Sequence, residues 1–309
     1  MMFENGKRYY TLDSFFKNKF GCKIAKITLN GGFGCPNRDG TKSTGGCIYC
    51  SEKLSGEFAG NPCDSIDKQF EEGVLRIGSK WKNVKYMPYF QAGTNTYAPT
   101  DKLRNLYEVA LLKENVVGMS IATRPDCISD ETLEYLEDIS ERTFLTVELG
   151  LQSVSDKTGE IINRCTTYAE FLDCYNKLKV RGIAVCVHLI NGLPGETKEM
   201  MLESVKQVSA LKPWAIKLHL LHIIKGTKCE KMYNSGELGV FEKDDYVNLI
   251  CDQLELVDKD IVIQRLTGDG ARDSLVAPLW SLKKFEVLNA IDKEMARRDS
   301  YQGKHAKII

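Results

Sequence analysis

The sequence of 309 residues lacks any apolar run that approaches the roughly 20 residues a membrane helix needs. Its first residues, MMFENGKR, also lack the apolar core of a signal peptide, so we expect a cytoplasmic protein that does not engage a membrane. The eleven cysteines are then expected in a reducing compartment, as metal ligands, catalytic thiols or buried thiols rather than disulfides. The chain also has no linker rich in proline or serine, no internal repeat and no low-complexity tract.

The sequence also lacks net charge, because 42 Lys and Arg residues balance 42 Asp and Glu residues. A hydrophobic share of 43% and a charged share of 27% are typical of a folded globular chain and exclude a disordered or collagen-like one. The charges are unevenly distributed: residues 1–26 carry six basic and two acidic side chains, and residues 283–309 carry seven and four. Such basic ends on an acidic middle predict either a polyanion-binding surface or a pair of solvated termini.

Short apolar runs rich in β-branched residues alternate with amphipathic segments of helix length. The predicted strands are residues 23–29, 84–91, 117–123, 144–151, 183–190 and 215–222, and the predicted helices are residues 65–79, 100–114, 130–140, 168–179 and 198–211. Ser129 and Thr197 are expected to cap two of these helices. The alternation predicts an α/β fold with a parallel sheet, either open or curled into part of a barrel, and a site at the C-terminal ends of its strands.

After residue 225 the pattern changes. Helices are predicted at residues 228–235, 243–257 and 282–297, with a strand at residues 261–266 and a Gly-Asp-Gly turn at residues 268–270. We therefore expect a basic N-terminal extension (residues 1–22), a core (residues 23–225) and a C-terminal extension packed on that core (residues 226–309).

The strongest chemical signal is the set of three cysteines Cys35, Cys47 and Cys50, in the segments GGFGCPNRDG and GGCIYC directly after the first predicted strand. Two cysteines separated by two residues can place both sulfurs on one metal centre, and a glycine-rich loop of eleven residues can return the third. A four-iron cluster with one open iron, a zinc site, and redox or buried thiols all remain possible on spacing alone. For zinc, the nearest further cysteines, Cys22 and Cys63, have no partner at ribbon spacing.

These residues resemble the radical S-adenosylmethionine (radical SAM) superfamily, in which a loop after the first strand carries three cysteines and an aromatic residue, here Tyr49, precedes the last of them. The spacing of eleven and then two residues differs from the commonest family pattern of three and two, but it is similar to the branch of the elongator catalytic subunit. Further family-like segments are YFQAGTNT (89–96), IATRPD (121–126), VELGLQS (147–153), NR (163–164) and HLINGLPGET (188–197). The segments that flank these motifs, with QRLTGDG at residues 264–270, resemble a bacterial elongator-like group within the radical SAM superfamily.

The resemblance implies a partial (β/α)6 barrel with a C-terminal α/β extension, a [4Fe–4S] cluster on the three cysteines, and S-adenosylmethionine beside it. It implies that the enzyme reductively cleaves S-adenosylmethionine to a 5′-deoxyadenosyl radical, with electrons from a flavodoxin or ferredoxin. The residues that the resemblance implies for binding S-adenosylmethionine are Tyr49, Gly93, Thr94, Asn95, Arg124, Glu148, Gln152, Arg164 and Ile190. The residue that donates or accepts a hydrogen atom or proton is not indicated.

For the substrate, the resemblance implies the wobble uridine of tRNA, with conversion of a carboxymethylaminomethyl substituent to aminomethyl. Arg265 and Asp269 are candidate contacts to the base or its side group, or else a polar turn cap. The basic side chains expected to hold RNA phosphates are Lys7, Arg8, Lys17, Lys19, Arg297, Arg298, Lys304 and Lys307. A radical SAM enzyme on a small molecule and a zinc-stabilised binding protein are the alternatives.

Charged residues in or near the predicted strands could have a structural role instead of a ligand-binding one. Glu148 and Arg164 are costly to bury without partners, and a zwitterionic amino-acid moiety would satisfy both. Glu148 could instead pair with Arg124, and Arg164 could be a solvated charge at a helix end. His188, His219 and His222 alternate with apolar residues, which favours cleft or core histidines over metal ligands.

Overall fold

The computed structural model describes residues 3, 6–78, 81 and 83–306. Seven parallel strands form one sheet in the order β1-β2-β3-β4-β5-β6-β8. Their bounds are β1 (Ile24–Leu29), β2 (Lys85–Phe90), β3 (Gly118–Thr123), β4 (Phe144–Gln152), β5 (Ala184–Asn191), β6 (Ala215–Leu220) and β8 (Val262–Arg265). The six core strands lie where the apolar runs predict them, and the C-terminal segment supplies the seventh.

The sheet is curled into a partial barrel. Lys26 of β1 and Gln264 of β8 belong to the two edge strands of the sheet, yet Lys26 Nζ donates a hydrogen bond to Gln264 Oε1 at 3.1 Å. An open, flat sheet would hold these side chains far apart, because neighbouring strands are spaced about 4.8 Å. The predicted parallel partial barrel is therefore confirmed.

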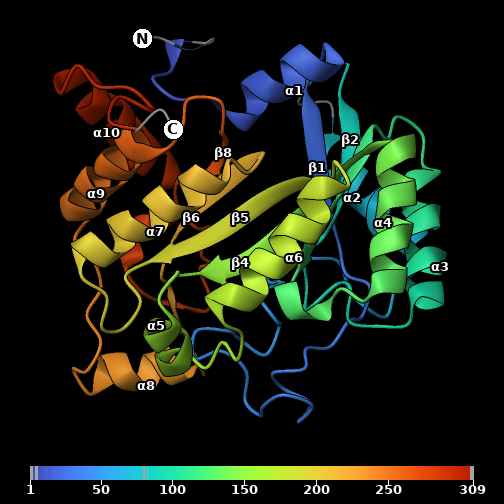
Figure 1. Cartoon of the computed structure of the whole chain (residues 1–309), viewed down its shortest axis with the longest axis horizontal. Helices are drawn as coiled ribbons and strands as arrows, with labels where there is room; N and C mark the ends of the chain where they lie inside the picture. The colour runs from blue at the N-terminus through green and yellow to red at the C-terminus, as the bar shows by residue number, and fades with distance from the viewer. Residues whose placement is uncertain (1–2, 4–5, 79–80, 82, 307–309) are drawn as a thin grey trace.

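Helices cover the outside of the curled sheet (Figure 1). Those of the core are α2 (Ile66–Ile77), α3 (Thr100–Leu111), α4 (Asp130–Arg142), α5 (Asp156–Ile161), α6 (Tyr168–Val180) and α7 (Lys198–Leu211). The predicted caps Ser129 and Thr197 accept hydrogen bonds from the backbone N–H groups of Thr132 and Met200. The helix predicted for residues 65–79 ends at Ile77, and its last predicted residue lies outside the described part of the chain.

The ends of the chain form further elements. The N-terminal segment holds α1 (Leu12–Phe20), which is capped by Thr11 at its N-terminal end and by Gly21 at its C-terminal end. After the core come α8 (Lys228–Asn234), α9 (Lys243–Leu256) and α10 (Lys284–Arg297), and two short strands, β7 (Ile223–Ile224) and β9 (Leu275–Ala277), pair antiparallel. Two 3₁₀ turns, η3 (Pro125–Cys127) and η4 (Leu279–Leu282), complete the set.

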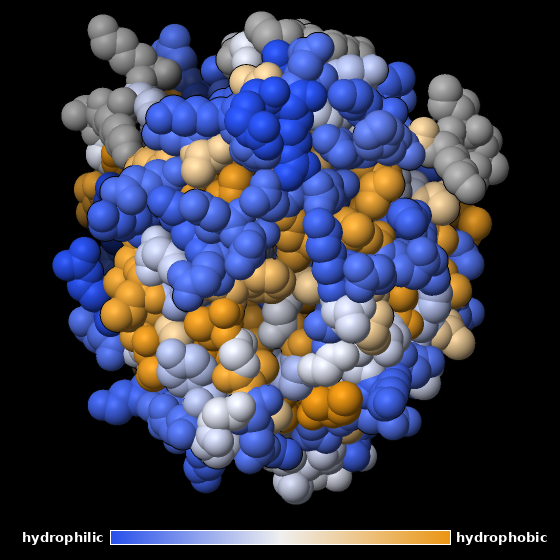
Figure 2. Space-filling model, turned by 90° about the vertical axis from the view of Figure 1, so that its left-hand side faces the viewer, coloured by the Kyte–Doolittle hydropathy of each residue, from blue (hydrophilic) through white to orange (hydrophobic). Residues whose placement is uncertain are grey.

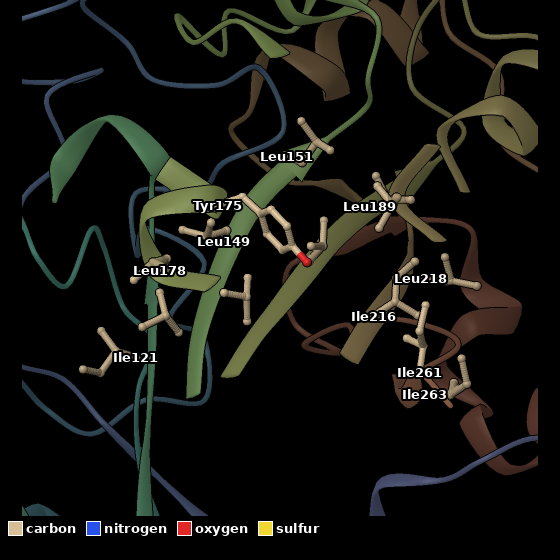
Figure 3. Packing of buried hydrophobic residues seen from close by; sticks show 14 of the residues in the cluster. Ile121, Leu149, Leu151, Tyr175, Leu178, Leu189, Ile216, Leu218, Ile261 and Ile263 are labelled. Atoms are coloured by element: carbon tan, nitrogen blue, oxygen red, sulfur yellow. The ribbon is translucent and has the colours of Figure 1, made fainter. Parts of the chain in front are cut away.

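The two faces of the sheet differ in character because side chains alternate along each strand. On β4, Leu145, Val147, Leu149 and Leu151 are buried in the main hydrophobic core. Figure 3 shows Leu149 beside Tyr175 and Leu178, which α6 contributes to the same core. The residues between them on β4, including Glu148, Gly150 and Gln152, face the inside of the barrel, where they line a cavity. The strands thus carry apolar side chains on the helix side and polar ones within.

The basic ends of the chain lie away from that cavity. Within the described residues, Lys7 pairs with Asp292, Arg8 with Asp299, Lys17 with Asp13, and Arg297 and Arg298 with Glu294. Lys19 Nζ lies 4.8 Å from the ring centre of Phe144, the first residue of β4, and so sits at the N-terminal ends of the strands. Helices α1 and α10, near the two ends of the described chain, lie at the upper end of the molecule (Figure 1), which is mainly hydrophilic in Figure 2. Lys304 is exposed, and Lys307 lies outside the described residues.

Candidate active site

The loop between β1 and α2 holds the three cysteines at the C-terminal ends of the strands. Backbone turns shape it: Cys50 N donates to Cys47 O at 3.0 Å, and Asp39 bridges to Thr44. Arg38 fixes the last cysteine by donating from Nη2 to the carbonyl oxygens of Cys50 (2.7 Å) and Ser51 (2.6 Å). The loop is thus held by its own side chains as well as by its glycines.

The three thiols are electrostatic neighbours. Burial raises the pKa of Cys47, with a smaller contribution from Cys35, and burial followed by the charge of Cys47 raises the pKa of Cys50 to about 11. Such thiols stay protonated at neutral pH unless a strongly positive centre stabilises their thiolates. Cys35, Cys47 and Cys50 are free thiols that line one cavity, and thiolates are the ligands that bind iron–sulfur clusters. Within the described residues the three side chains are not already gathered around one metal position, so it is their chemistry and their shared cavity that suit a cluster.

Asn37 is a buried neighbour of the cysteines that sequence reasoning missed. Its Nδ2 lies 3.5 Å from Cys47 Sγ and also donates to the backbone oxygen of Asn163, while its Oδ1 has no hydrogen-bond partner within the described residues. A donor aimed at a cluster sulfur stabilises the thiolate and tunes the metal centre. An asparagine in a glycine-rich loop gives no sequence signal for this role.

Arg124 joins the cysteine loop to the end of β3. It forms a two-pronged ion pair with Asp126, with both N–O distances 2.9 Å, and Lys42 of the cysteine loop binds the same carboxylate at 2.7 Å. Arg124 also donates to the carbonyl oxygen of Arg164 at 2.9 Å. The alternative pairing of Glu148 with Arg124 is therefore wrong, because Asp126, two residues away, takes the guanidinium.

Arg164 is buried, with 2% of its surface exposed. It donates to the carbonyl oxygens of Leu151 (2.6 Å), Ser153 (2.6 Å) and Thr166 (2.7 Å), and it pairs with Asp156 at 3.1 Å. The alternative of a solvated helix-end charge is wrong as well. Arg164 holds the C-terminal end of β4 in place, at the edge of the cavity.

Gly93 lies where the turn after β2 meets the cysteine loop. Its φ is +73°, and Gly93 N and Thr94 N donate to the carbonyl oxygens of Leu54 (3.1 Å) and Gly34 (3.0 Å). A Cβ at this position would lie 2.3 Å from the carbonyl oxygen of Phe33. Only glycine allows this approach, and through it the backbone just before Cys35 is tied to the sheet.

We expect Gly93→Ala to lower the free energy of unfolding by roughly 2–5 kcal/mol, because it adds both left-handed strain and a backbone clash. Gly182→Ala is the matched control: its φ is +69°, but a Cβ there meets nothing within 4 Å, so only about 1–2 kcal/mol is expected. Urea unfolding of both variants measures the difference, and iron content should fall for Gly93→Ala alone. Equal costs for the two variants would contradict the close approach.

One cavity of about 330 Å³ brings most of the predicted site residues together. Its lining includes Cys35, Cys47, Cys50, Tyr49, Gly93, Thr94, Arg124, Glu148, Gln152, Arg164, Ile190, Arg265 and Asp269. Asn95 is the exception: it is fully buried behind the lining, and its Nδ2 donates to the carbonyl oxygen of Ala122 at 2.8 Å. The cysteines and the C-terminal segment thus border the same space.

A ring of polar side chains, one from each strand of the sheet, lies inside the barrel, and four of its residues, Tyr89, Glu148, His188 and Lys217, line the cavity. We call this ring the barrel belt; it consists of Lys26, Tyr89, Ser120, Glu148, His188, Lys217 and Gln264. Glu148 lies at its centre and is fully buried. Its Oε1 accepts from Lys26 (2.7 Å) and Ser120 (2.8 Å), and its Oε2 accepts from Tyr89 (2.8 Å), His188 (2.9 Å) and Lys217.

These contacts determine the charge state of the belt. Burial alone would raise the pKa of Glu148, but the charges of Lys217 and Lys26 and the hydrogen bond from His188 hold it well below its usual range. Burial lowers the pKa of Lys217 to about 8, although Glu148 opposes the shift. One clue to this arrangement is present in the sequence, since Lys26, Glu148, His188 and Lys217 each stand between outward-facing apolar residues of a strand.

Three of the four histidines face this interior, and they predict a pH dependence of stability. Burial lowers the pKa of His188 and of His222 to about 4, and that of His219 well below 6.5. The unfolded chain takes up protons near pH 6.5 while the folded one does not, so stability is full above that pH and is lost as pH falls towards 4.

Between pH 6.5 and pH 5 we expect the unfolding free energy to drop by roughly 2 kcal/mol for each of these histidines. Urea unfolding at the two pH values measures the drop. In His222→Gln the drop should be smaller by the contribution of one histidine, roughly 2 kcal/mol. His305→Gln is the control, because His305 is exposed. A drop of the same size in wild type and His222→Gln would contradict the assignment.

A model of the radical SAM superfamily matches residues 29–208, and one of the Radical SAM C-terminal domain matches residues 213–297. The chain belongs to the radical SAM superfamily. It is 49% identical to the uncharacterized protein YtqA of Bacillus subtilis over 298 residues, which cover 96% of this chain and 92% of that protein. It is 22% identical to the tRNA uridine(34) acetyltransferase of Methanocaldococcus infernus over 220 residues, 69% of this chain and 40% of that protein.

Among solved structures, the N-terminally truncated Elp3 of Methanocaldococcus infernus matches with a TM-score of 0.67 and 16% identity, over 91% of this chain and 64% of that one. The match shows that the two share the radical SAM fold. The chain is accordingly an iron–sulfur enzyme that uses a [4Fe–4S] cluster and S-adenosylmethionine. The zinc-stabilised binding protein is thereby set aside. No helix in the described part of the chain is long and apolar enough to cross a bilayer.

Proposed function

We propose that this radical SAM enzyme modifies the wobble uridine of tRNA and converts a carboxymethylaminomethyl substituent to aminomethyl. The observation that carries the proposal is that one cavity is lined both by the three cysteines and by Arg265 and Asp269 of the C-terminal segment. When bound, the cluster and S-adenosylmethionine would supply the 5′-deoxyadenosyl radical chemistry by which a hydrogen atom could be taken from the substrate. A substrate group that reaches the shared cavity from the C-terminal side would meet that chemistry.

We assign the cysteine end of the cavity to the cofactors. Cys35, Cys47 and Cys50 would hold the cluster, which a flavodoxin or ferredoxin would reduce. The residues that would border S-adenosylmethionine are Tyr49, Gly93, Thr94, Arg124, Gln152, Arg164 and Ile190. Glu148 would not contact S-adenosylmethionine directly, because both of its oxygens already accept hydrogen bonds from other residues of the barrel belt. Asn95 supports the wall from behind.

An RNA substrate is supported by the relative that acts on tRNA uridine 34, as its name states. The expected phosphate contacts at the two basic ends are not supported, because their side chains are largely engaged in ion pairs away from the cavity. Three exposed cations, Lys53, Lys225 and Arg272, are each next in sequence to a lining residue and have no ion pair in the described part of the chain. Glu52 and Asp273 flank two of them, so we expect few phosphate contacts and a shallow salt dependence.

The test is anaerobic reconstitution, with iron and sulfide measured per chain and 5′-deoxyadenosine formation measured with and without tRNA that carries the carboxymethylaminomethyl group. We expect tRNA to stimulate 5′-deoxyadenosine formation and the wobble nucleoside to change to its aminomethyl form, as detected by mass spectrometry. Cofactor cleavage that tRNA does not stimulate, with unchanged wobble nucleosides, would point to a small-molecule substrate instead.

A further inference from the structure

Two groups of ion pairs border the C-terminal side of the cavity, and cations outnumber carboxylates in each group; Lys217, Glu148, Arg265 and Asp269 of these groups line the cavity. Lys26 and Lys217 share the single carboxylate of Glu148, and Arg265 and Lys284 share that of Asp269, at 2.9 Å and 2.6 Å. Four cations therefore face two carboxylates. Glu57 also lines the cavity, and its charge acts on His222, so one positive charge still remains unmatched.

Arg265 has most of its hydrogen-bonding capacity unused. A guanidinium offers five N–H donors, and within the described residues Arg265 makes one ionic contact, from Nη2 to Asp269. Its side chain is 32% exposed and lines the cavity. Burial is the main reason that the pKa values of His188, His219, His222 and Lys217 are lowered, and the charge of Arg265 lowers each of them further. Arg265 is thus within electrostatic reach of all four groups.

Two neighbouring histidines also lack partners. His219 Nε2 and His222 Nε2 are buried atoms without a hydrogen bond in the described structure, and both residues line the cavity. Each can donate one hydrogen bond as a neutral imidazole. The great majority of buried polar atoms in proteins have a hydrogen-bond partner. Buried polar atoms that face a cavity without one therefore indicate a ligand group that accepts their hydrogen bonds.

We propose that Arg265, with His219, His222 and Lys217 around it, forms an anion subsite that binds a carboxylate of the substrate. This inference rests on the proposed function and deepens it, since the carboxymethylaminomethyl group carries a carboxylate that the aminomethyl product lacks. A carboxylate accepts two parallel hydrogen bonds from a guanidinium, which is the geometry that Arg provides and Lys does not. The subsite therefore distinguishes substrate from product: the anion is held while it is attached to the uridine, and the product has nothing to bind there.

The arginine at the cysteine end of the cavity, Arg124, is not available to bind the substrate carboxylate. Arg124 is the arginine whose charge acts on Cys47, and its guanidinium is held by Asp126, Thr166 and the carbonyl oxygen of Arg164. The carboxylate that enters beside Arg265 is therefore assigned to the substrate.

The test is binding to the reconstituted holoenzyme of three anticodon stem-loop RNAs, with carboxymethylaminomethyl, its neutral carboxamide, or aminomethyl at the wobble uridine. Wild type should bind the carboxylate RNA at least tenfold more tightly than the carboxamide RNA, and Arg265→Gln should reduce that ratio to less than twofold. Arg272→Gln is the matched control: it removes an exposed cation next in sequence to a lining residue and should weaken binding of all three RNAs equally.

Iron content and melting temperature show whether Arg265→Gln is folded. If it is not, Arg265→Lys, which keeps the charge but loses the two-pronged geometry, should show an intermediate ratio. An unchanged preference in both Arg265 variants, or wild-type binding that does not distinguish carboxylate from carboxamide, would overturn the subsite while leaving the proposed function standing. Failure of all three RNAs to bind would overturn the proposed function, and the subsite with it.

Discussion

Replacement of Cys35, Cys47 or Cys50 by alanine is expected to reduce iron from about four atoms per chain to less than one, and to abolish formation of 5′-deoxyadenosine. The three thiols line one cavity, and the charges of neighbouring thiols act on Cys47 and Cys50, so loss of any one leaves two thiolates for four irons. Iron and sulfide analysis, the visible absorption of the anaerobic protein and 5′-deoxyadenosine assays measure the effect.

The control is Cys63→Ala. Cys63 belongs to the same connection between β1 and α2, is exposed, and does not line the cavity. Its loss should leave iron content and cofactor cleavage at the wild-type level. Full iron content in each of the three single variants, or an equal loss in Cys63→Ala, would show that the cluster is bound elsewhere.

The fold was largely predictable because each core strand is apolar on the side that packs against helices. The alternation of Val185, Val187 and Leu189 with less apolar residues identifies β5 without any knowledge of its neighbours. The seventh strand was predicted as a strand, but its position beside β6 depends on contacts between distant parts of the chain. The strands β7 and β9 have two and three residues, which is too short for a periodic pattern.

Helix α1 was missed although its signals are present. Thr11 caps it by accepting from Ser14 N, and Gly21 ends it at φ +70°. The basic side chains of this segment suggested a polyanion-binding extension, whereas several of them are paired with carboxylates of the chain itself, as Lys17 and Lys23 are with Asp13. Charge counts along a sequence do not show which charges neutralise each other in space.

The site was predictable where its residues are close in sequence and not where they are brought together by the sheet. The cysteines and the glycines near them carry local motifs. The barrel belt joins Lys26, Glu148 and Lys217 from three strands more than 60 residues apart, as the separations of 122 and 69 positions between the hydrogen-bonded pairs show. Each residue alone looks like a polar interruption of a strand.

The belt gives the second large expected effect. Glu148→Gln should lower the free energy of unfolding by about 3–5 kcal/mol, because it removes the one carboxylate that, within the described residues, pairs with Lys26 and Lys217. The new amide N–H group would also face the donors of Ser120 and Lys26 or those of Tyr89 and Lys217. A typical domain is stable by 5–15 kcal/mol, so we expect a large loss of soluble protein as well.

Glu57→Gln is the matched control, since Glu57 also lines the cavity but accepts its hydrogen bond from the neutral hydroxyl of Ser51. Urea unfolding should place this variant within about 1 kcal/mol of wild type. The double variant Glu148→Gln with Lys217→Met removes one of the stranded cations, so its loss of stability should be smaller than the sum of the two single losses, with a coupling of about 0.5–3 kcal/mol. If Glu148→Gln costs no more than Glu57→Gln, the belt is hydrated rather than held by its own ion pairs, and the interior of the barrel does not depend on Glu148 for its charge balance.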